Sequence, residues 1–459
     1  MASDTIQFVD SIASSPTVRL NLNDETTWRV RSFVAPPPRL RRTMTQNAMT
    51  DGGFVSTSQY GPRTLFIDLD LVSTTQDLNA AQLQLLAREL DRETNFIKYQ
   101  PVGATSPVFF KTWRSDFSAL VDMKAALAFR QLSLEVVAEP FARGLMETVS
   151  VGTVGNDPGD EYTTGPSPNC RFDVSGVKGD VPADFTLTDT YSRGTGDVTW
   201  IAQRCEASFT GWANYYPAET AGSYGTDTTL IAGPDAAMSG NGVGGSTGNF
   251  TRTAFTSTAV AARVNGTLPA IQATRGTYRV FAVVRRSDAT SVIQVGMSAT
   301  DLTTLPLTTS RIRVDLGLYG FGSGTELNTL PSPLAGNTFS VFAGRASGTG
   351  NLDWDYIEFQ PADTATLVWS SPGAGQYAGF DGAVDLAFGY STSGSITAGT
   401  AYVYPASASL GGFPQLRPGL VNRFFMARTT SAGVISKTTS GTVTLYYNPC
   451  YLHVRPATT

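Results

Sequence analysis

Among the carboxylates that could perform acid–base chemistry, the most suggestive pair is Asp68 and Asp70. They lie in residues 64–72, where apolar and polar side chains alternate. Alternation predicts a β-strand, which places both carboxylates on the same face. A glycosidase needs two carboxylates roughly 5 to 9.5 Å apart on facing walls of a cleft. We expect these two on the face opposite the core, as solvated side chains without a catalytic role.

Histidine and cysteine are too sparse for the commonest catalytic and metal sites. His453 is the single histidine in 459 residues, and histidine supplies much of the acid–base catalysis and metal binding near neutral pH. Cys170, Cys205 and Cys450 are too scattered for a zinc site or a disulfide framework, so we expect them as small buried side chains. The chain is therefore not expected to be an enzyme.

The overall composition disfavours several classes of partner. The length predicts roughly three domains. A net charge of −5 disfavours nucleic acid, whose binding proteins carry basic surfaces. No apolar run reaches the roughly 18 residues that a membrane-spanning helix needs. Residues 1–10 contain two aspartates and no basic residue, so no secretory signal is expected there.

Charge density changes near residue 150. Charged side chains number 31 in residues 1–150 and 40 in the other 309. The stretch 149–160, rich in Gly, Asn and Asp, predicts a flexible linker between the two parts.

The first part mixes strands with one helix. Leucines spaced three and four residues apart predict a helix over 80–93, with Asn79 as its N-cap. The predicted strands are 17–22 and 28–34, which would form a hairpin, and 64–72 and 131–138. This order indicates an α+β unit.

After residue 160 the pattern is β throughout. Short alternating runs separated by Gly, Pro, Asn and Ser are typical of a β-sandwich or jelly roll. The predicted runs are 184–189, 276–285, 291–299, 311–318, 338–343, 352–360 and 401–404. Residues 375–459 form either a third small β domain or strands that complete a sheet begun at 170–200.

A stiff basic arm follows the strand at 28–34. Three prolines favour an extended polyproline conformation, and three arginines follow them closely. The arm consists of Pro36, Pro37, Pro38, Arg39, Arg41 and Arg42. It is either a segment that contacts a neighbouring subunit or an ordinary exposed loop.

Two further groups of side chains could form sites in the middle of the chain. The carboxylates of Glu206 and Asp355 would converge if the first and last strands of a jelly roll pair, and oxygen ligands suit Ca²⁺; the alternative is plain surface carboxylates, with Trp354 in the core. A second group is aromatic and would either stack on sugar rings or fill the core. Its members are Trp212, Tyr215, Tyr216 and Tyr224.

Two parts of the chain resemble known families. Residues 17–150 resemble the N-terminal hub domain of distal tail proteins, the minor tail proteins of long-tailed (siphovirus-type) phages. The resemblance rests on LDRETNFIKYQP at 90–101, VFFKTW at 108–113 and LEVVAEPFARG at 134–144. The closing VTLYYNPCYLHVRP at 443–456 resembles the C-terminal strand of the same proteins.

Residues 201–362 resemble a galactose-binding-type jelly roll, as found in carbohydrate-binding modules. The matching stretches are GTYRVFAVVR at 276–285, VDLG at 314–317 and NLDWDYIEFQP at 351–361. Members of that group often hold a structural Ca²⁺ where Glu206 and Asp355 fall here. Their second acidic residue corresponds to Ser208 in this chain.

Together these resemblances imply a mainly β chain of four parts. Residues 1–150 would be an α+β ring-forming tail-hub domain, and 151–200 a linker with the first strands of the C-terminal region. Residues 201–362 would be the jelly roll and 363–459 a small C-terminal β domain.

The resemblances also imply a function. The chain would be a virion protein of the phage tail tip, made in the host cytoplasm, and would form a homo-oligomeric ring, most simply a hexamer. Its partners would be the tail tube protein, the tape measure protein and other tail-tip proteins, with host cell-wall polysaccharide bound through the jelly roll. No cofactor beyond a structural Ca²⁺ is expected. The alternatives are a carbohydrate-active enzyme with an appended binding module, and a surface adhesin from outside phages.

Overall fold

The structure is a computed structural model of the chain, in which two compact units are distinguished. Unit 1 comprises Met1–Glu147, Val177–Ala183 and Tyr447–Thr459, and unit 2 comprises Thr148–Gly176 and Asp184–Tyr446. The described residues are 3–46, 53–115, 117–120, 129–155, 171–204, 214–218, 223–231, 250–267, 276–322, 333–335, 338–361, 365–371, 373–390, 407–411, 413–429 and 440–453.

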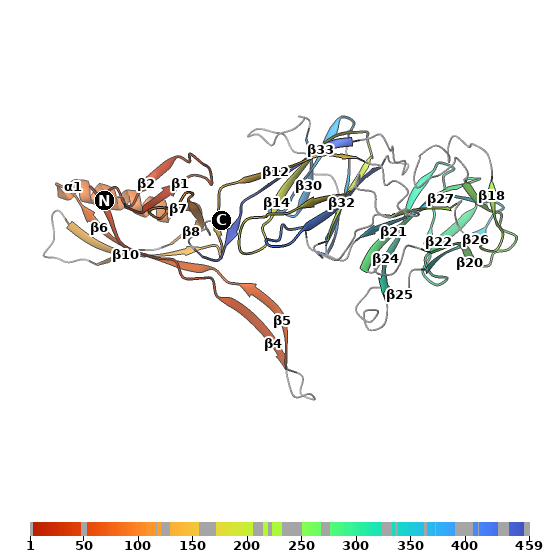
Figure 1. The fold of residues 1–459 in the computed structure, drawn as a ribbon, viewed down its shortest axis with the longest axis horizontal. Coiled ribbons are helices and arrows are strands. Elements are labelled where there is room, and N and C mark those ends of the chain that lie inside the picture. The colour runs from red at the N-terminus through yellow and green to blue at the C-terminus, as the bar shows by residue number, and fades with distance from the viewer. Residues whose placement is uncertain are drawn as a thin grey trace. The chain divides into compact units, whose positions relative to one another are not determined.

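Unit 1 is built on one ten-stranded sheet with the main order β2-β1-β7-β8-β10-β6-β3 (Figure 1). β9 pairs with β10, and β11 pairs with both β8 and β34. The strands are β1 (Thr5–Val9), β2 (Val18–Asn21), β3 (Trp28–Val34), β6 (Arg63–Val72), β7 (Thr94–Gln100), β8 (Val108–Trp113), β9 (Phe117–Leu120), β10 (Phe129–Ala138), β11 (Ala142–Arg143) and β34 (Cys450–Tyr451).

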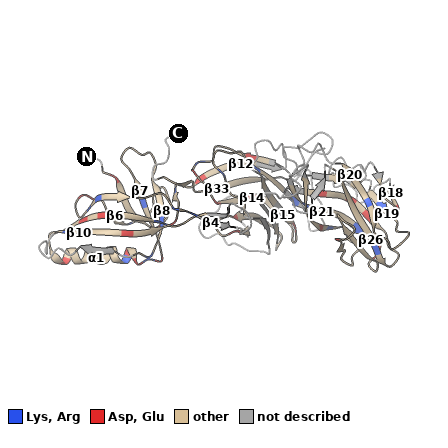
Figure 2. Cartoon of the chain, turned by 90° about the horizontal axis from the view of Figure 1, so that it is seen from below, with Lys and Arg blue, Asp and Glu red and all other residues tan. Residues whose placement is uncertain are grey.

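The helix α1 (Gln76–Leu90) covers one face of this sheet (Figure 2). Leu86 and Leu90 of the helix are buried in one hydrophobic cluster with the alternating leucines and isoleucine of β6. Burying a leucine or isoleucine side chain contributes roughly 1.5–3 kcal/mol. The period-two pattern of β6 and the helical spacing of the leucines therefore produce the same core.

Two predictions for unit 1 are wrong in detail. The helix begins earlier than expected, because Thr75 is the N-cap and its hydroxyl accepts a hydrogen bond from the Leu78 amide. Asn79 lies inside the helix and is buried. The predicted hairpin does not form, since β2 pairs with β1 and β3 pairs with β6. The two strands are neighbours in sequence, but each forms its hydrogen bonds with another strand of the sheet.

Unit 2 contains a sandwich assembled from strands far apart in sequence, which we call the split sandwich. One sheet has the order β12-β33-β14-β29-β30, and the facing sheet has β13-β32-β15-β28-β31. Its strands are β12 (Glu147–Gly155), β13 (Arg171–Val174), β14 (Phe185–Arg193), β15 (Val198–Arg204), β28 (Ala365–Ser370), β29 (Gln376–Asp381), β30 (Leu386–Tyr390), β31 (Ser407–Gly411), β32 (Asn422–Thr429) and β33 (Ser440–Tyr447).

The split sandwich decides between the two arrangements that the sequence leaves open for residues 375–459. Strands from that region pair within both sheets with strands from 171–204, as β32 does with β13 and β15. The region therefore completes sheets begun earlier. The predicted linker at 149–160 begins as a strand, because β12 extends to residue 155 and pairs with β33.

The rest of unit 2 is a second sandwich, which we call the inserted sandwich. A seven-stranded sheet of order β18-β19-β27-β21-β24-β25, with β16 beside β27, faces a five-stranded sheet of order β17-β20-β26-β22-β23. Its strands are β16 (Asn214–Pro217), β17 (Ser223–Tyr224), β18 (Thr228–Ile231), β19 (Phe250–Thr253), β20 (Ala261–Thr267), β21 (Gly276–Arg286), β22 (Val292–Gly296), β23 (Thr303–Thr304), β24 (Ile312–Gly322), β25 (Pro333–Ala335), β26 (Thr338–Ser347) and β27 (Leu352–Pro361).

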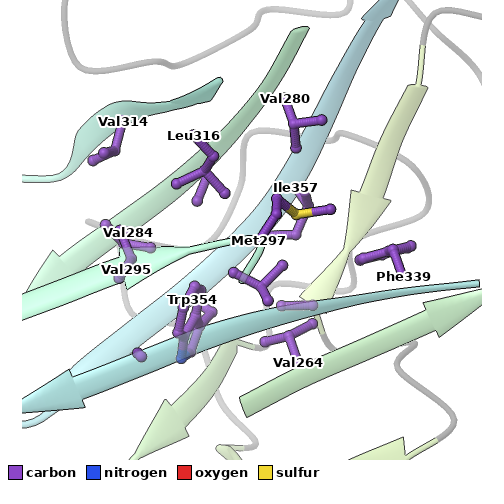
Figure 3. Packing of buried hydrophobic residues seen from close by; sticks show 14 of the residues in the cluster. Val264, Val280, Val284, Val295, Met297, Val314, Leu316, Phe339, Trp354 and Ile357 are labelled. Atoms are coloured by element: carbon purple, nitrogen blue, oxygen red, sulfur yellow. The ribbon is translucent and has the colours of Figure 1, made fainter. Parts of the chain in front are cut away.

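The core of the inserted sandwich contains side chains from both sheets (Figure 3). Trp354 is fully buried in this core, as the sequence predicts, and its indole Nε1 donates to Thr253 Oγ1 at 2.9 Å. The predicted fold class, mainly β with an N-terminal α+β region, is confirmed. Within the described residues, no helix is long and apolar enough to cross a membrane.

The chain enters and leaves the inserted sandwich through two strands that lie side by side. β15 precedes it and β28 follows it, and the two pair directly, with Gln203 opposite Ala365. The insertion therefore occupies the position of a turn between neighbouring strands of the split sandwich.

Candidate functional site

A two-stranded ribbon in unit 1 is the first candidate site. β4 (Leu40–Gln46) and β5 (Gly53–Tyr60) pair with each other, and neither joins another sheet among the described strands (Figure 1). An isolated two-stranded hairpin is marginally stable in water, because one pair of strands buries little apolar surface. A ribbon of this kind gains stability when another surface covers it.

The predicted proline–arginine arm forms the foot of this ribbon. Residues 36–39 precede the first strand without regular structure, and Arg41 and Arg42 lie within β4. Pro38 is buried, whereas Arg39 and Arg41 are exposed. The amide of Gly61 donates to the Arg39 carbonyl at 2.9 Å, which closes the foot of the ribbon and fixes the direction in which the arm leaves the sheet.

Exposed apolar side chains occur where the chain leaves the sheet for the ribbon and where it returns, in two cross-strand pairs, which we call the foot pairs. Val34 lies opposite Phe66 on β3 and β6, and Leu40 lies opposite Tyr60 on β4 and β5. Val34 is 50% and Phe66 41% exposed. Short segments link the two pairs along the chain. Exposed apolar and aromatic groups that gather in this way mark interaction surfaces.

Asp68 and Asp70 lie on the outer face of β6, as predicted. The Asp68 carboxylate accepts a hydrogen bond from Ser133 Oγ at 2.8 Å. Asp70 forms an ion pair with Arg31, with 3.0 Å between Oδ1 and Nε. Both carboxylates are therefore engaged in cross-strand contacts of a half-buried sheet face.

Residues from the far end of the chain complete unit 1. β34 pairs with β11, and the Leu452 amide donates to Asp180 Oδ2 at 2.9 Å. Gly179 adopts a φ of 116°, and a Cβ there would lie 2.8 Å from the Cys450 carbonyl oxygen, so glycine is required at this crossing.

The buried side chain of Arg63 links β6 to the C-terminal residues of unit 1. The sequence did not single this residue out. Its guanidinium donates to the carbonyls of Pro140 at 2.6 Å and Leu452 at 3.2 Å, and it stacks over the Phe110 ring. Burial lowers the pKa of Arg63 to about 10, so the group stays charged near neutral pH. The only sequence signal was an arginine opening a strongly apolar strand.

The predicted sugar-stacking aromatics do not all present a face to solvent. Tyr216 is 1% exposed and packs edge-on against Phe339 in the core of the inserted sandwich, so its inclusion in an exposed platform is wrong. Tyr224 is half-buried against the same core. Trp212 and the side chain of Tyr215 lie outside the described residues.

Asp355, one of the two predicted calcium ligands, is paired with an arginine. Asp355 is buried and forms an ion pair with Arg311, whose side chain is equally buried. The carboxylate is thus already neutralised by a cation. Glu206 lies outside the described residues, and the part of the chain that the structure describes holds no group of three or more metal-ligating residues. The calcium ion stays a prediction.

Comparison with known proteins gives matches in solved structures only. No family model matches the chain, and no curated protein matches it. The chain resembles the crystal structure of the SPP1 Dit (gp 19.1) protein, described as a paradigm of the hub adsorption apparatus in phages infecting Gram-positive bacteria. Identity is 7%, with 98% of this chain and 99% of that chain covered and a TM-score of 0.36.

Two structures of the phage P2 baseplate in its activated conformation are also similar. The structure with Ca shares 8% identity over 98% of each chain, with a TM-score of 0.30. The structure with Sr shares 8% identity over 44% of this chain and 72% of that chain, with a TM-score of 0.27.

Proposed function

We propose that the chain is a structural protein of a phage tail tip that assembles through unit 1 into a ring, most simply a hexamer. The observation that carries this proposal is the free-standing ribbon β4–β5 with the foot pairs at its base. The sequence resemblance of residues 17–150 to distal tail proteins supports the same role. Catalysis has no part in it.

The ribbon suits contact between copies of the chain. A closed ring requires a heterologous interface, in which one surface of each copy meets a different surface of the next. The ribbon would be the first of these surfaces, with exposed Arg39 and Arg41 supplying positive charge and the foot pairs supplying apolar area. When a neighbouring copy covers the ribbon, the unpaired backbone groups at the strand edges and the apolar side chains of the foot pairs are removed from water. The ring would lie between the tail tube protein and the other tail-tip proteins, with the tape measure protein as a further partner.

The inserted sandwich would contact host cell-surface polysaccharide. Its entry and exit through paired neighbouring strands support a separable role, because the split sandwich needs only a turn at that point. Trp212, Tyr215 and Tyr224 remain the candidate stacking residues, since Tyr216 is committed to the core.

Electron microscopy of the purified full chain tests ring formation. We expect closed rings from the natural chain. A variant in which residues 43–57 are replaced by an Asn-Gly turn should remain folded and monomeric. The paired substitution Val34→Ser with Phe66→Ser should weaken rings in the same way.

The matched control is Val384→Ser with Leu386→Ser. These two side chains are exposed to a similar degree but lie in unit 2, so rings should persist. Monomers of the natural chain at high concentration in native mass spectrometry, together with its absence from tail tips in labelled virions, would refute the proposal.

Deletion of the inserted sandwich tests glycan contact separately. Replacing residues 205–364 by a short turn should leave rings intact and abolish binding to purified host cell-wall polysaccharide. Undiminished binding by this variant would show that the contact lies elsewhere in the chain.

A further inference from the structure

The two sheets of the inserted sandwich carry different side chains on their outer faces. The outer face of the seven-stranded sheet is charged. Asp353 on β27 accepts a hydrogen bond from Arg285 on β21 at 2.9 Å. Phe281 on the same face lies against the guanidiniums of Arg279 and Arg313, whose central carbons are 5.8 and 3.4 Å from the ring centroid. The charges and the ring on this face are therefore already engaged with one another.

The outer face of the five-stranded sheet is uncharged at every paired strand position, and we call it the neutral face. Val264 and Phe339 point from this sheet into the core (Figure 3), so Phe342 and its cross-strand partners lie on the opposite face. The pairing of β20, β26, β22 and β23 places six polar residues there with it. They are Thr267, Thr338, Asn265, Ser340, Gln294 and Thr304.

Phe342 lies on the middle strand of the neutral face and is half-buried. Its direct neighbours across the sheet are small, Ala262 on β20 and Gly296 on β22. A Cβ at Gly296 would overlap the Asp301 carbonyl oxygen, so the loop after β22 borders the ring on that side. No aromatic ring or guanidinium of the described residues stacks on Phe342. In contrast to Phe281, this ring is not covered by an arginine.

Polar pairs flank Phe342 at both ends along the strand. Alternate residues of a strand lie about 7 Å apart. At one end Ser340 lies opposite Asn265, and its hydroxyl donates to Asn265 Oδ1 at 2.7 Å. At the other end Gln294 Nε2 donates to Thr304 Oγ1 at 3.2 Å. These bonds fix the direction of the amides, while the hydroxyls can still donate or accept further hydrogen bonds.

We propose that Phe342 is the residue on which the inserted sandwich stacks a sugar ring of a neutral polysaccharide. The proposal rests on the proposed contact between this sandwich and polysaccharide, and it assigns that contact to one face. A pyranose has an apolar C–H face and a rim of hydroxyls, which match an aromatic side chain flanked by amides and hydroxyls. Stacking of this kind needs no deep pocket. An anionic polymer would find no cation at the strand positions of this face.

Affinity electrophoresis of the full chain tests this site, with glucan, galactan or mannan in the gel and polygalacturonate as the anionic comparison. We expect at least one neutral polysaccharide to retard the natural chain and polygalacturonate to have no effect. Phe342→Leu keeps an apolar side chain without a ring and should bind about three- to tenfold more weakly. Phe342→Trp keeps a ring and should bind as the natural chain does.

Two further variants separate the site from a general effect on the fold. Gln294→Ala removes one flanking amide and should weaken binding about threefold. The control is Leu230→Ala, which removes a 40% exposed apolar side chain from the other sheet and should leave binding unchanged. Thermal unfolding of each variant checks that the sandwich remains folded.

The outcomes distinguish this site from the wider glycan contact. Equal binding by Phe342→Leu and the natural chain, with binding lost when residues 205–364 are deleted, would overturn the site and leave the glycan contact standing. No retardation of the natural chain by any neutral polysaccharide would overturn both. If Phe342→Leu changes the oligomeric state in native mass spectrometry but not the binding, the neutral face contacts a second copy of the chain and the proposal is wrong.

Discussion

Unit 1 and the inserted sandwich use the chain in opposite ways. The inserted sandwich is one uninterrupted stretch that begins and ends on paired strands, so its core depends on no distant segment. Unit 1 is assembled from three stretches, and its sheet is completed by β34. A domain of the first kind can be lost or exchanged without harm to its surroundings. A domain of the second kind ties the ends of the chain together, which suits a frame on which other parts depend.

The largest effect that follows from this contrast concerns residues 447–459. Their removal should unfold unit 1, because it takes away β34, the Leu452 acceptor of Arg63 and the bond between Leu452 and Asp180. We expect the free energy of unfolding of unit 1 to fall by about 4 kcal/mol or more. Limited proteolysis detects this loss as rapid cleavage within residues 1–147. The replacement of residues 205–364 by a turn should leave unit 1 resistant. Equal resistance of the two deletions would contradict the contrast.

A core cavity in the inserted sandwich should have a large but local effect. Phe359→Ala removes a fully buried ring that packs against Phe321 and Phe339. It should lower the free energy of unfolding of that sandwich by about 3–5 kcal/mol, measured by urea titration. Rings seen in the microscope should be unchanged. Leu307→Ala, at an exposed position, is the control and should cost less than about 0.5 kcal/mol.

A smaller effect is expected at the junction of unit 1. Arg63→Met keeps the apolar stem but leaves the carbonyls of Pro140 and Leu452 without their donor. The cost should be about 1–3 kcal/mol in the unfolding free energy of unit 1. Arg29→Met, at an exposed position on β3, should unfold as the natural chain does. A change at Arg63 no larger than that at Arg29 would show that the hydrogen bonds of the Arg63 guanidinium are dispensable.

The smallest effect is a pH dependence confined to the inserted sandwich. The Asp288 carboxylate accepts from the Ser291 and Thr290 amides at 2.6 and 2.8 Å and from both hydroxyls. These bonds, the Ser291 amide first, lower the pKa of Asp288 to about 2. Its stabilising effect should be complete above the ordinary value of 3.8 and lost as the pH falls through about 2.

Thermal unfolding of the full chain from pH 5 to pH 2 checks this sign. The stability difference between the natural chain and Asp288→Asn should shrink as the pH falls. Asp301→Asn, which removes a carboxylate from another exposed loop of the same sandwich, provides the control. A difference at Asp288 that grows toward low pH would contradict the prediction.

The sequence is informative where structure is decided locally. Period-two alternation located β6 and β10 to within two residues, and the buried Trp354 followed from its place in a strand. Strand pairing is decided over long distances, so the hairpin predicted from 17–34 was wrong. The proline-rich arm was recognised, but the ribbon beyond it was not, because residues 40–60 lack a clear apolar alternation.

Charged contacts between distant residues were the least predictable feature. Asp189 and Arg428 are far apart in sequence and lie on facing sheets, and neither neighbourhood signals the other. The same holds for Arg311 and Asp355, whose ion pair occupies a carboxylate that the resemblance assigns to calcium. The sequence left a sugar-stacking platform and the core both open for Tyr216, because its strand is too short for alternation to mark an inner face.

The late completion of unit 1 has a consequence for synthesis on the ribosome. The first 147 residues emerge early, but β34 follows only after some 300 further residues. At about 5–20 residues per second, the incomplete sheet would wait roughly 15 to 60 s for its last strand. During that interval the inserted sandwich, whose residues are contiguous, can already fold. Copies that are still being translated would thus be poor partners for one another, and assembly would begin with nearly finished chains.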